Sequence, residues 1–196
     1  TYMRKERKRP RRDVSINNAI KELSEIEGLS ENKIKSISIV LNALSHQVGD
    51  HIARFQIEAT RAALSEASSS KPLAIVAGVS SGKTIAFALP LLVNAVDRSL
   101  NGQGGRVRAL FVYPRATLVE DQFQRIQTWS VKINEYYGSQ LLHGPALDAA
   151  GKLPQQVSPA KRINIIDALR LAFPRGNKSH EFVFTTIETL KNRLQN

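Results

Sequence analysis

The sequence predicts an α/β fold, with a parallel sheet flanked by helices and a small helical segment before it. Three observations predict this fold. Residues 73–77 form a short apolar run bounded by Pro72 and Gly78, which is typical of a buried central strand. A loop of small residues and an apolar helix follow at once. A second apolar run, residues 107–113, precedes another helical segment, and this alternation predicts parallel strands joined by a right-handed crossover.

The loop after the first strand has the features of a phosphate-binding loop. It satisfies the pattern G-x-x-x-x-G-K-[ST] with alanine in place of the first glycine. Backbone N–H groups of small residues can close around phosphate oxygens, and a helix start adds unsatisfied N–H donors. Lys83 can reach the β- and γ-phosphates of a nucleotide, and the Thr84 hydroxyl can ligate Mg²⁺. The predicted nucleotide-binding residues are Ala77, Gly78, Val79, Ser80, Ser81, Gly82, Lys83 and Thr84, and the last two are also the predicted catalytic residues. The alternative is a Gly/Ser turn with an incidental lysine.

The charge of the chain predicts a polyanionic partner. The formal net charge is +11 and the pI is about 10.2, which favours nucleic acid. Residues 1–13 are predicted to be a disordered arm that contacts phosphates, or else a solvated linker. Its basic residues are Arg4, Lys5, Arg7, Lys8, Arg9, Arg11 and Arg12.

Residues 14–49 are predicted to be a helical segment that packs on the domain formed by residues 50–196. Apolar residues recur at helical spacing from Ile16 onward, Gly28 ends the first helix, and Ser30 caps the second. A third helix is expected over residues 50–67. It carries Phe55 and Gln56, an aromatic ring that can stack on adenine and an amide that can bind its edge, although such a pair is also common on ordinary helix surfaces.

The remaining elements follow from periodicity and turn residues. The helix after the loop should end near Leu100, and Pro90 should bend it or end its regular hydrogen bonding. A strand over residues 107–113 is stopped by Pro114, and a helix is expected over residues 115–130. We expect a strand over residues 131–137, an irregular stretch over residues 141–157, and a helix over residues 158–173.

These motifs, in this order, resemble the first RecA-like domain of a superfamily 2 helicase of the DEAD/DEAH-box kind. Phe55-Gln56 resembles the adenine-reading Q motif, and AGVSSGKTIAFALPLL (residues 77–92) resembles motif I with its helix. YPRATLVEDQ (residues 113–122) resembles motif Ia, and FTTIETLKNRL (residues 184–194) resembles motif Ib. The resemblance covers residues 50–196 and implies ATP and Mg²⁺ as cofactors.

The resemblance also implies a nucleic-acid track at the carboxyl ends of the strands. Pro114 and Arg115 would contact the phosphodiester backbone of one strand, as would Thr185 and Thr186 through hydroxyls or N–H groups. The alternatives are a solvated helix start for Arg115 and plain β-propensity for the two threonines. Motif Ia reads Pro-Arg-Ala-Thr-Leu here, whereas DEAD-box RNA helicases usually have Pro-Thr-Arg-Glu-Leu, and this favours DNA over RNA.

The resemblance predicts an ATP-dependent helicase or translocase. The alternatives are another P-loop NTPase, such as a kinase or a regulatory ATPase, and a binding protein that kept only the fold. The acidic motif and the second RecA-like domain of the family are not in this sequence, so we expect these 196 residues to bind ATP poorly and to hydrolyse it hardly at all. The chain has no cysteine, no secretory signal and no membrane-spanning apolar run, so we expect a cytoplasmic protein; its oligomeric state is open.

Overall fold

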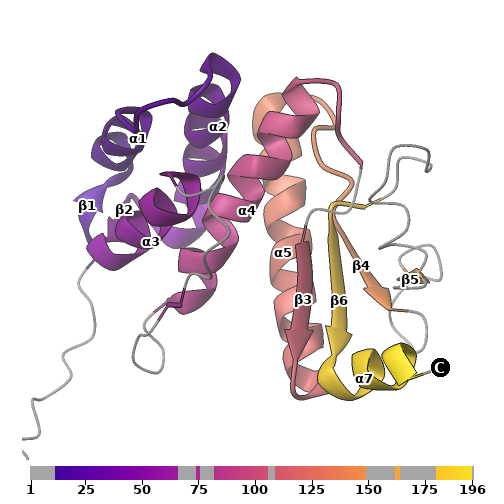
Figure 1. Ribbon diagram of the computed structural model, residues 1–196. Coiled ribbons are helices and arrows are strands. Elements are labelled where there is room, and N and C mark those ends of the chain that lie inside the picture. The colour runs from indigo at the N-terminus through magenta and orange to yellow at the C-terminus, as the bar shows by residue number, and fades with distance from the viewer. Residues whose placement is uncertain are drawn as a thin grey trace, which may run out of the picture. The chain divides into compact units, whose positions relative to one another are not determined.

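A computed structural model describes residues 12–65, 74–75, 82–105, 109–148, 162–163 and 180–195. The chain divides into two compact units, residues 1–93 and residues 94–196 (Figure 1). The first unit contains β1 (Arg12–Ser15), α1 (Ile16–Ser24), α2 (Glu31–Val48), β2 (His51–Ala53) and α3 (Arg54–Ser65). Helix α4 (Lys83–Leu100) begins in the first unit and ends in the second. The second unit contains β3 (Ala109–Tyr113), α5 (Ala116–Tyr137), β4 (Pro145–Asp148), β5 (Arg162–Ile163), β6 (Phe182–Thr186) and α7 (Ile187–Gln195).

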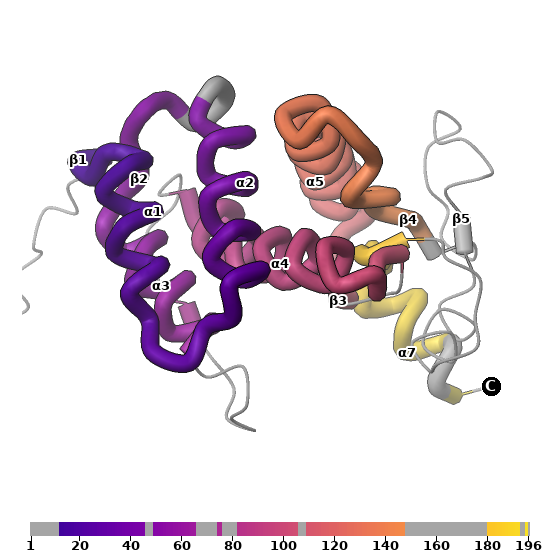
Figure 2. The backbone as a smooth tube through the Cα atoms, turned by 90° about the horizontal axis from the view of Figure 1, so that it is seen from above, coloured from indigo at the N-terminus to yellow at the C-terminus, as the bar shows by residue number. Residues whose placement is uncertain are grey.

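The first unit packs its helices around a two-stranded antiparallel sheet. Strand β1 pairs with β2, and the Ile16 N–H donates to the Asp50 carbonyl at 3.0 Å, which closes the pair where α1 begins. Ser15 and Ser30 cap α1 and α2 through their hydroxyls, as their residue types favour. Figure 2 shows α1 lying beside α2. Fully buried apolar side chains form the core, among them Ala19, Leu23, Ile37, Val40, Ile52 and Ile57.

The structure corrects two boundaries in this unit. Residues 12 and 13, predicted to be disordered, and residues 14 and 15, predicted to be helical, form β1, because they pair in antiparallel register with residues 51–53. Residues 51–53, predicted to be helical, form β2, and α3 begins only at Arg54. Periodicity within one segment cannot reveal this pairing, since the two strands lie some forty residues apart in the sequence. The rest of the predicted arm, residues 1–11, lies outside the described residues.

The second unit is built on a parallel sheet with strand order β3-β6-β4-β5. Helix α5 lies against one face of it (Figure 2), where Phe123 meets Phe184 edge to face at 5.9 Å between ring centroids. Phe111 stacks on the same Phe184 at 4.5 Å, so aromatic rings bind β3 to β6. At the amino ends of the strands, the buried Glu181 carboxylate accepts hydrogen bonds of 2.9–3.2 Å from the N–H groups of Gly105, His143 and Gly144.

Several predictions for the second unit are wrong in detail. Residues 131–137, predicted to be a strand, continue α5 to Tyr137, because Ile133 extends the helical spacing of buried residues and Gly138 supplies the left-handed cap. Residues 145–148, predicted to be irregular, form β4 in parallel with β6. Arg162 and Ile163 form β5 within the predicted helix over residues 158–173, because they pair with β4. The other residues of that segment lie outside the described part.

The main architectural prediction is confirmed: this is an α/β fold with parallel strands and flanking helices. Helix α4 has the predicted bounds and continues past Pro90. Ala74 and Ile75, predicted to belong to a buried strand, are irregular, and Ala74 is exposed; no described strand pairs with them, and a central strand needs such neighbours. Of the helices described, none is both long and apolar enough to cross a membrane.

Candidate functional site

The amino end of α4 carries the described part of the predicted phosphate loop. Gly82 precedes the helix with a φ of +85°, and Lys83 and Thr84, both half-buried, form the start of its first turn. The N–H groups of a first turn have no partner inside the helix, and the helix dipole adds positive charge there. This end of α4 can therefore bind an anion. Five residues of the predicted loop lie outside the described part: Ala77, Gly78, Val79, Ser80 and Ser81.

Gln56 of α3 fixes the geometry at Gly82. The Gln56 side chain is only 1% exposed, its Oε1 accepts a hydrogen bond from the Ala53 N–H at 3.0 Å, and its Nε2 donates to the Gly82 carbonyl at 2.9 Å. These partners define which end of the amide is oxygen and which is nitrogen. A Cβ atom on Gly82 would collide with Gln56 Nε2. Glycine is therefore favoured here by its positive φ, and any other residue would also have to displace the Gln56 amide.

These contacts leave the predicted role of Gln56 in binding adenine as a prediction. Phe55, its predicted stacking partner, is half-buried on the same helix. The amide of Gln56 keeps one N–H and one oxygen lone pair beyond the two hydrogen bonds described.

A second set of predicted residues lies at the carboxyl ends of β3 and β6. Tyr113 pairs in register with Thr186, so the neighbouring strands β3 and β6 end side by side. Pro114 and Arg115 follow β3 and are exposed, and Arg115 is the N-cap residue of α5. Helix α7 begins directly after Thr186. Two helix amino termini and one guanidinium therefore meet at this edge of the sheet, which favours an anion with several negative groups.

The two threonines differ in what they expose. Thr185 is 2% exposed, and its hydroxyl lies 3.5 Å from the Thr186 backbone carbonyl. Thr186 caps α7, because its hydroxyl accepts from the Thr189 N–H at 3.1 Å and lies 2.9 Å from the Thr189 hydroxyl. Of the two means of contact expected for these residues, hydroxyls and N–H groups, this arrangement favours the N–H groups at the start of α7.

Tyr113 is neutral at this edge. Burial raises the pKa of Tyr113 to about 12, and the nearby Asp121 carboxylate adds to the rise. Its ring lies parallel to that of Phe184, with centroids 6.4 Å apart. The phenol therefore adds no negative charge to a surface that would have to receive phosphates.

The described residues fit the cofactors that the sequence predicts. Directly after Gly82, Lys83 supplies an ammonium group and Thr84 supplies a hydroxyl at the helix start. No cluster of three or more histidine or carboxylate side chains that could bind a metal occurs among the residues described. Of the residues described at this site, Thr84 offers a hydroxyl oxygen, a ligand type that suits Mg²⁺.

Sequence reasoning missed several residues that shape these sites. The Ala53 N–H orients Gln56, Thr189 completes the cap with Thr186, and Glu22 of α1 pairs with Arg54 of α3. Each contact joins residues by geometry rather than by a sequence pattern. Only the Thr-x-x-Thr spacing at the start of α7 could have indicated one of them in advance.

The sequence of the chain matches the model of one known protein family. The family model described as DEAD/DEAH box helicase matches residues 53–166, more than half of the chain. The matched region runs from the last residue of β2 through α3, α4, β3, α5, β4 and β5. None of the curated proteins matches the chain.

Proposed function

Because this chain belongs to the DEAD/DEAH box helicase family, we propose that it is the ATP-binding, nucleic-acid-contacting part of an ATP-dependent helicase or translocase. Family membership itself supports a helicase-type function on nucleic acid, and the parallel sheet is that of an incomplete RecA-like fold. We further propose that the chain binds ATP and Mg²⁺ as cofactors and that Lys83, Thr84 and Arg115 contact phosphates or the metal.

One observation carries the nucleotide part of the proposal. Gly82 directly precedes an eighteen-residue helix that begins with Lys83 and Thr84, and a buried glutamine holds the Gly82 carbonyl in place. In this role Lys83 neutralises phosphate charge, Thr84 offers a metal ligand, and the first-turn N–H groups bind phosphate oxygens. Bound ATP with Mg²⁺ would supply the phosphoryl chemistry, which depends on such positioning and charge neutralisation.

The nucleic-acid part of the proposal rests on the carboxyl edge of β3 and β6. Arg115 and the starts of α5 and α7 present positive charge and N–H groups, which suit phosphate contacts rather than base contacts. Such contacts are independent of base sequence, as a motor that steps along any strand requires. DNA is favoured over RNA on the sequence of motif Ia alone.

Titrations on wild-type chain and Lys83→Ala test the proposal. A fluorescent ATP analogue with Mg²⁺ is titrated in one series, and single-stranded DNA and RNA oligonucleotides in another. We expect Lys83→Ala to lose at least about tenfold in nucleotide affinity, since a charge-assisted contact to phosphate contributes roughly 1.5–3 kcal/mol. Oligonucleotide binding should survive the substitution and weaken as salt is raised.

Two outcomes would contradict the proposal. Equal nucleotide affinity in wild type and Lys83→Ala would remove Lys83 from the binding site. Nucleotide binding without any oligonucleotide affinity, even at low salt, would favour a different P-loop NTPase such as a kinase. The folded state of Lys83→Ala is checked by circular dichroism, so that a loss of affinity cannot come from unfolding.

A further inference from the structure

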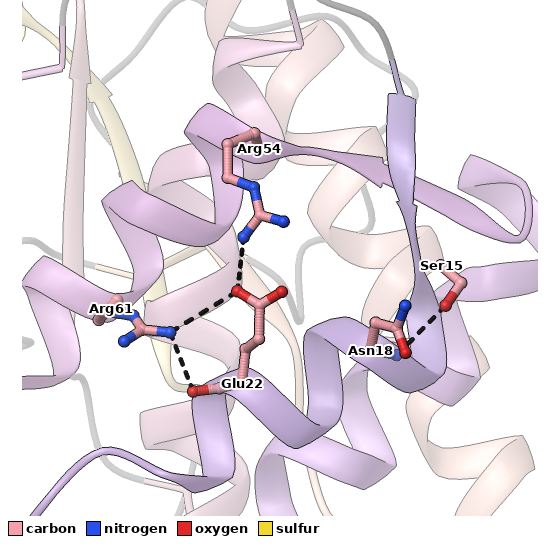
Figure 3. Close-up of polar contacts among 5 residues, drawn as sticks. All are labelled: Ser15, Asn18, Glu22, Arg54 and Arg61. Atoms are coloured by element: carbon pink, nitrogen blue, oxygen red, sulfur yellow. Dashed lines mark hydrogen bonds and ion pairs between the residues drawn. The ribbon is translucent and has the colours of Figure 1, made fainter.

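A polar cluster on the first unit ties α1 to α3. Glu22 of α1 lies between two arginines of α3: its Oε2 is 2.5 Å from Arg54 Nη1 and 3.7 Å from Arg61 Nη2 (Figure 3). Arg61 Nη2 also donates to the backbone carbonyl of Glu22 at 3.1 Å. Arg54 and Arg61 are seven residues apart, so they lie on one face of α3, two turns from each other. Glu22 of α1 thus contacts α3 at two positions, Arg54 and Arg61, which are two helical turns apart.

The same stretch of α3 carries the glutamine that holds the phosphate loop. Gln56 follows Arg54 by two residues and is buried, whereas both arginine side chains are about half exposed. Gln56 therefore lies on the buried face of α3, whereas the arginines that pair with Glu22 lie on its exposed face. Its two partners are Ala53, at the end of β2, and Gly82, at the start of α4.

The amino-terminal elements also fix the other partner of Gln56. Ala53 pairs in register with Arg12, and the Ile16 N–H donates to the Asp50 carbonyl at 3.0 Å. Ser15 caps α1 through the Asn18 N–H at 3.3 Å, so β1 passes directly into the helix that carries Glu22 (Figure 3). Both the helix of Gln56 and the N–H that orients its amide are thus held by residues 12–24.

We propose that Glu22 is a positioning residue for nucleotide binding: by gripping α3 through Arg54 and Arg61, it keeps Gln56 against the Gly82 carbonyl. The proposal deepens the proposed function and rests on it, because nucleotide is taken to bind at Gly82–Thr84. Among the described residues, the polar contacts of the Glu22 side chain are with Arg54 and Arg61, not with Gly82, Lys83 or Thr84. Its effect passes through the angle of α3, because a small rotation of that helix would pull the Gln56 amide away from Gly82.

The expected effect is modest, because the cluster is partly exposed. Glu22 is 29% exposed and the arginines 47–50%, and such pairs contribute little each, although a network contributes more than one pair. A loss of about three- to tenfold in nucleotide affinity corresponds to that range for two pairs. A change of this size is measurable and does not require the unit to unfold.

The experiment compares Glu22→Lys and Glu22→Gln with a matched control, Glu27→Lys. Glu27 is exposed in the turn after α1, so its substitution changes the net charge as Glu22→Lys does. The affinity for a fluorescent ATP analogue with Mg²⁺ is measured on each full chain. Amide hydrogen exchange at residues 82–85 is measured without nucleotide, and single-stranded DNA affinity serves as the internal reference.

We expect Glu22→Lys to bind nucleotide about three- to tenfold more weakly than Glu27→Lys and to exchange faster at residues 82–85. Glu22→Gln keeps the acceptor oxygen but loses the charge, so it should fall between wild type and Glu22→Lys. DNA affinity should be the same in the two lysine variants. If Glu22→Lys does not fold, Glu22→Gln against wild type decides the question by the same two measurements.

Unchanged exchange at residues 82–85 and equal nucleotide affinity in folded Glu22 variants would overturn the proposal. A wild-type chain that binds no nucleotide would instead reject the proposed function. In that case the exchange measurement alone still tests whether Glu22 holds Gly82 through α3, because it needs no ligand.

Discussion

At the scale of single residues, the backbone conformation before α4 and the proposed nucleotide binding both depend on glycine at position 82. Its φ is +85°, and a Cβ there would meet the amide of Gln56. Gly102 is a useful control because its φ is +70° and a Cβ there would meet nothing within 4 Å. The two glycines therefore separate backbone strain from steric collision.

We expect Gly82→Ala to be more costly than Gly102→Ala. Backbone strain alone should lower the free energy of unfolding by about 1–2 kcal/mol in Gly102→Ala. Gly82→Ala adds the collision with Gln56, so it should lose more stability and also weaken nucleotide binding, whereas Gly102→Ala should leave nucleotide affinity unchanged. Urea unfolding and nucleotide titration measure the two effects. Equal losses in both variants would mean that Gln56 moves aside without consequence.

The start of α4 at Lys83 and Thr84 could be predicted from sequence, because the phosphate-loop pattern has fixed residue types at fixed spacing before a helix. The contact between Gln56 and Gly82 could not, since it joins residues 26 positions apart and depends on the angle of α3. The burial of Glu181 could not be predicted either. A glutamate before a strand gives no sign that it will be 1% exposed and will accept hydrogen bonds from N–H groups of two distant loops. Burial of this kind is decided by tertiary packing.

At the scale of elements, the carboxyl-terminal half of α5 shows where local pattern is ambiguous. Residues 131–137, VKINEYY, alternate apolar and polar at first, which suits a strand as well as a helix. The segment is helical because Ile126 and Ile133 continue the buried face of α5 that Val119 and Phe123 begin. Asn134 then holds the following loop, accepting from the Leu141 and Leu142 N–H groups at 2.9 Å.

Substitutions at Val131 and Ile133 distinguish the two interpretations of this segment. In a strand both side chains would share a face, but in α5 Ile133 is 0% exposed and Val131 is 41% exposed. We expect Ile133→Ala to cost about 2–4 kcal/mol of unfolding free energy and Val131→Ala about 0.5 kcal/mol or less. Thermal and urea unfolding of the two variants give the comparison. Similar costs would contradict the helical assignment.

At the scale of the whole molecule, a net charge of +11 predicts attraction to any polyanion, and this general attraction must be separated from a defined contact. Arg115 and Lys132 both lie on or next to α5. Arg115 is at its amino end, beside Thr186 and β6, while Lys132 pairs with Glu135 at 2.6 Å. They are about 25 Å apart along the helix at 1.5 Å per residue. Removing either lowers the net charge equally.

We therefore expect Arg115→Ala and Lys132→Ala to differ in how single-stranded DNA affinity depends on salt. If Arg115 neutralises one phosphate, its removal should reduce the slope of log affinity against log salt by about 0.7, since fewer counterions are released on binding. Lys132→Ala should keep the wild-type slope, because loss of a remote charge weakens steering without removing a contact. Fluorescence anisotropy across a salt series measures both slopes. Equal slopes in the two variants would mean that Arg115 contacts no phosphate and that it contributes to nucleic-acid binding only through the net charge of the chain.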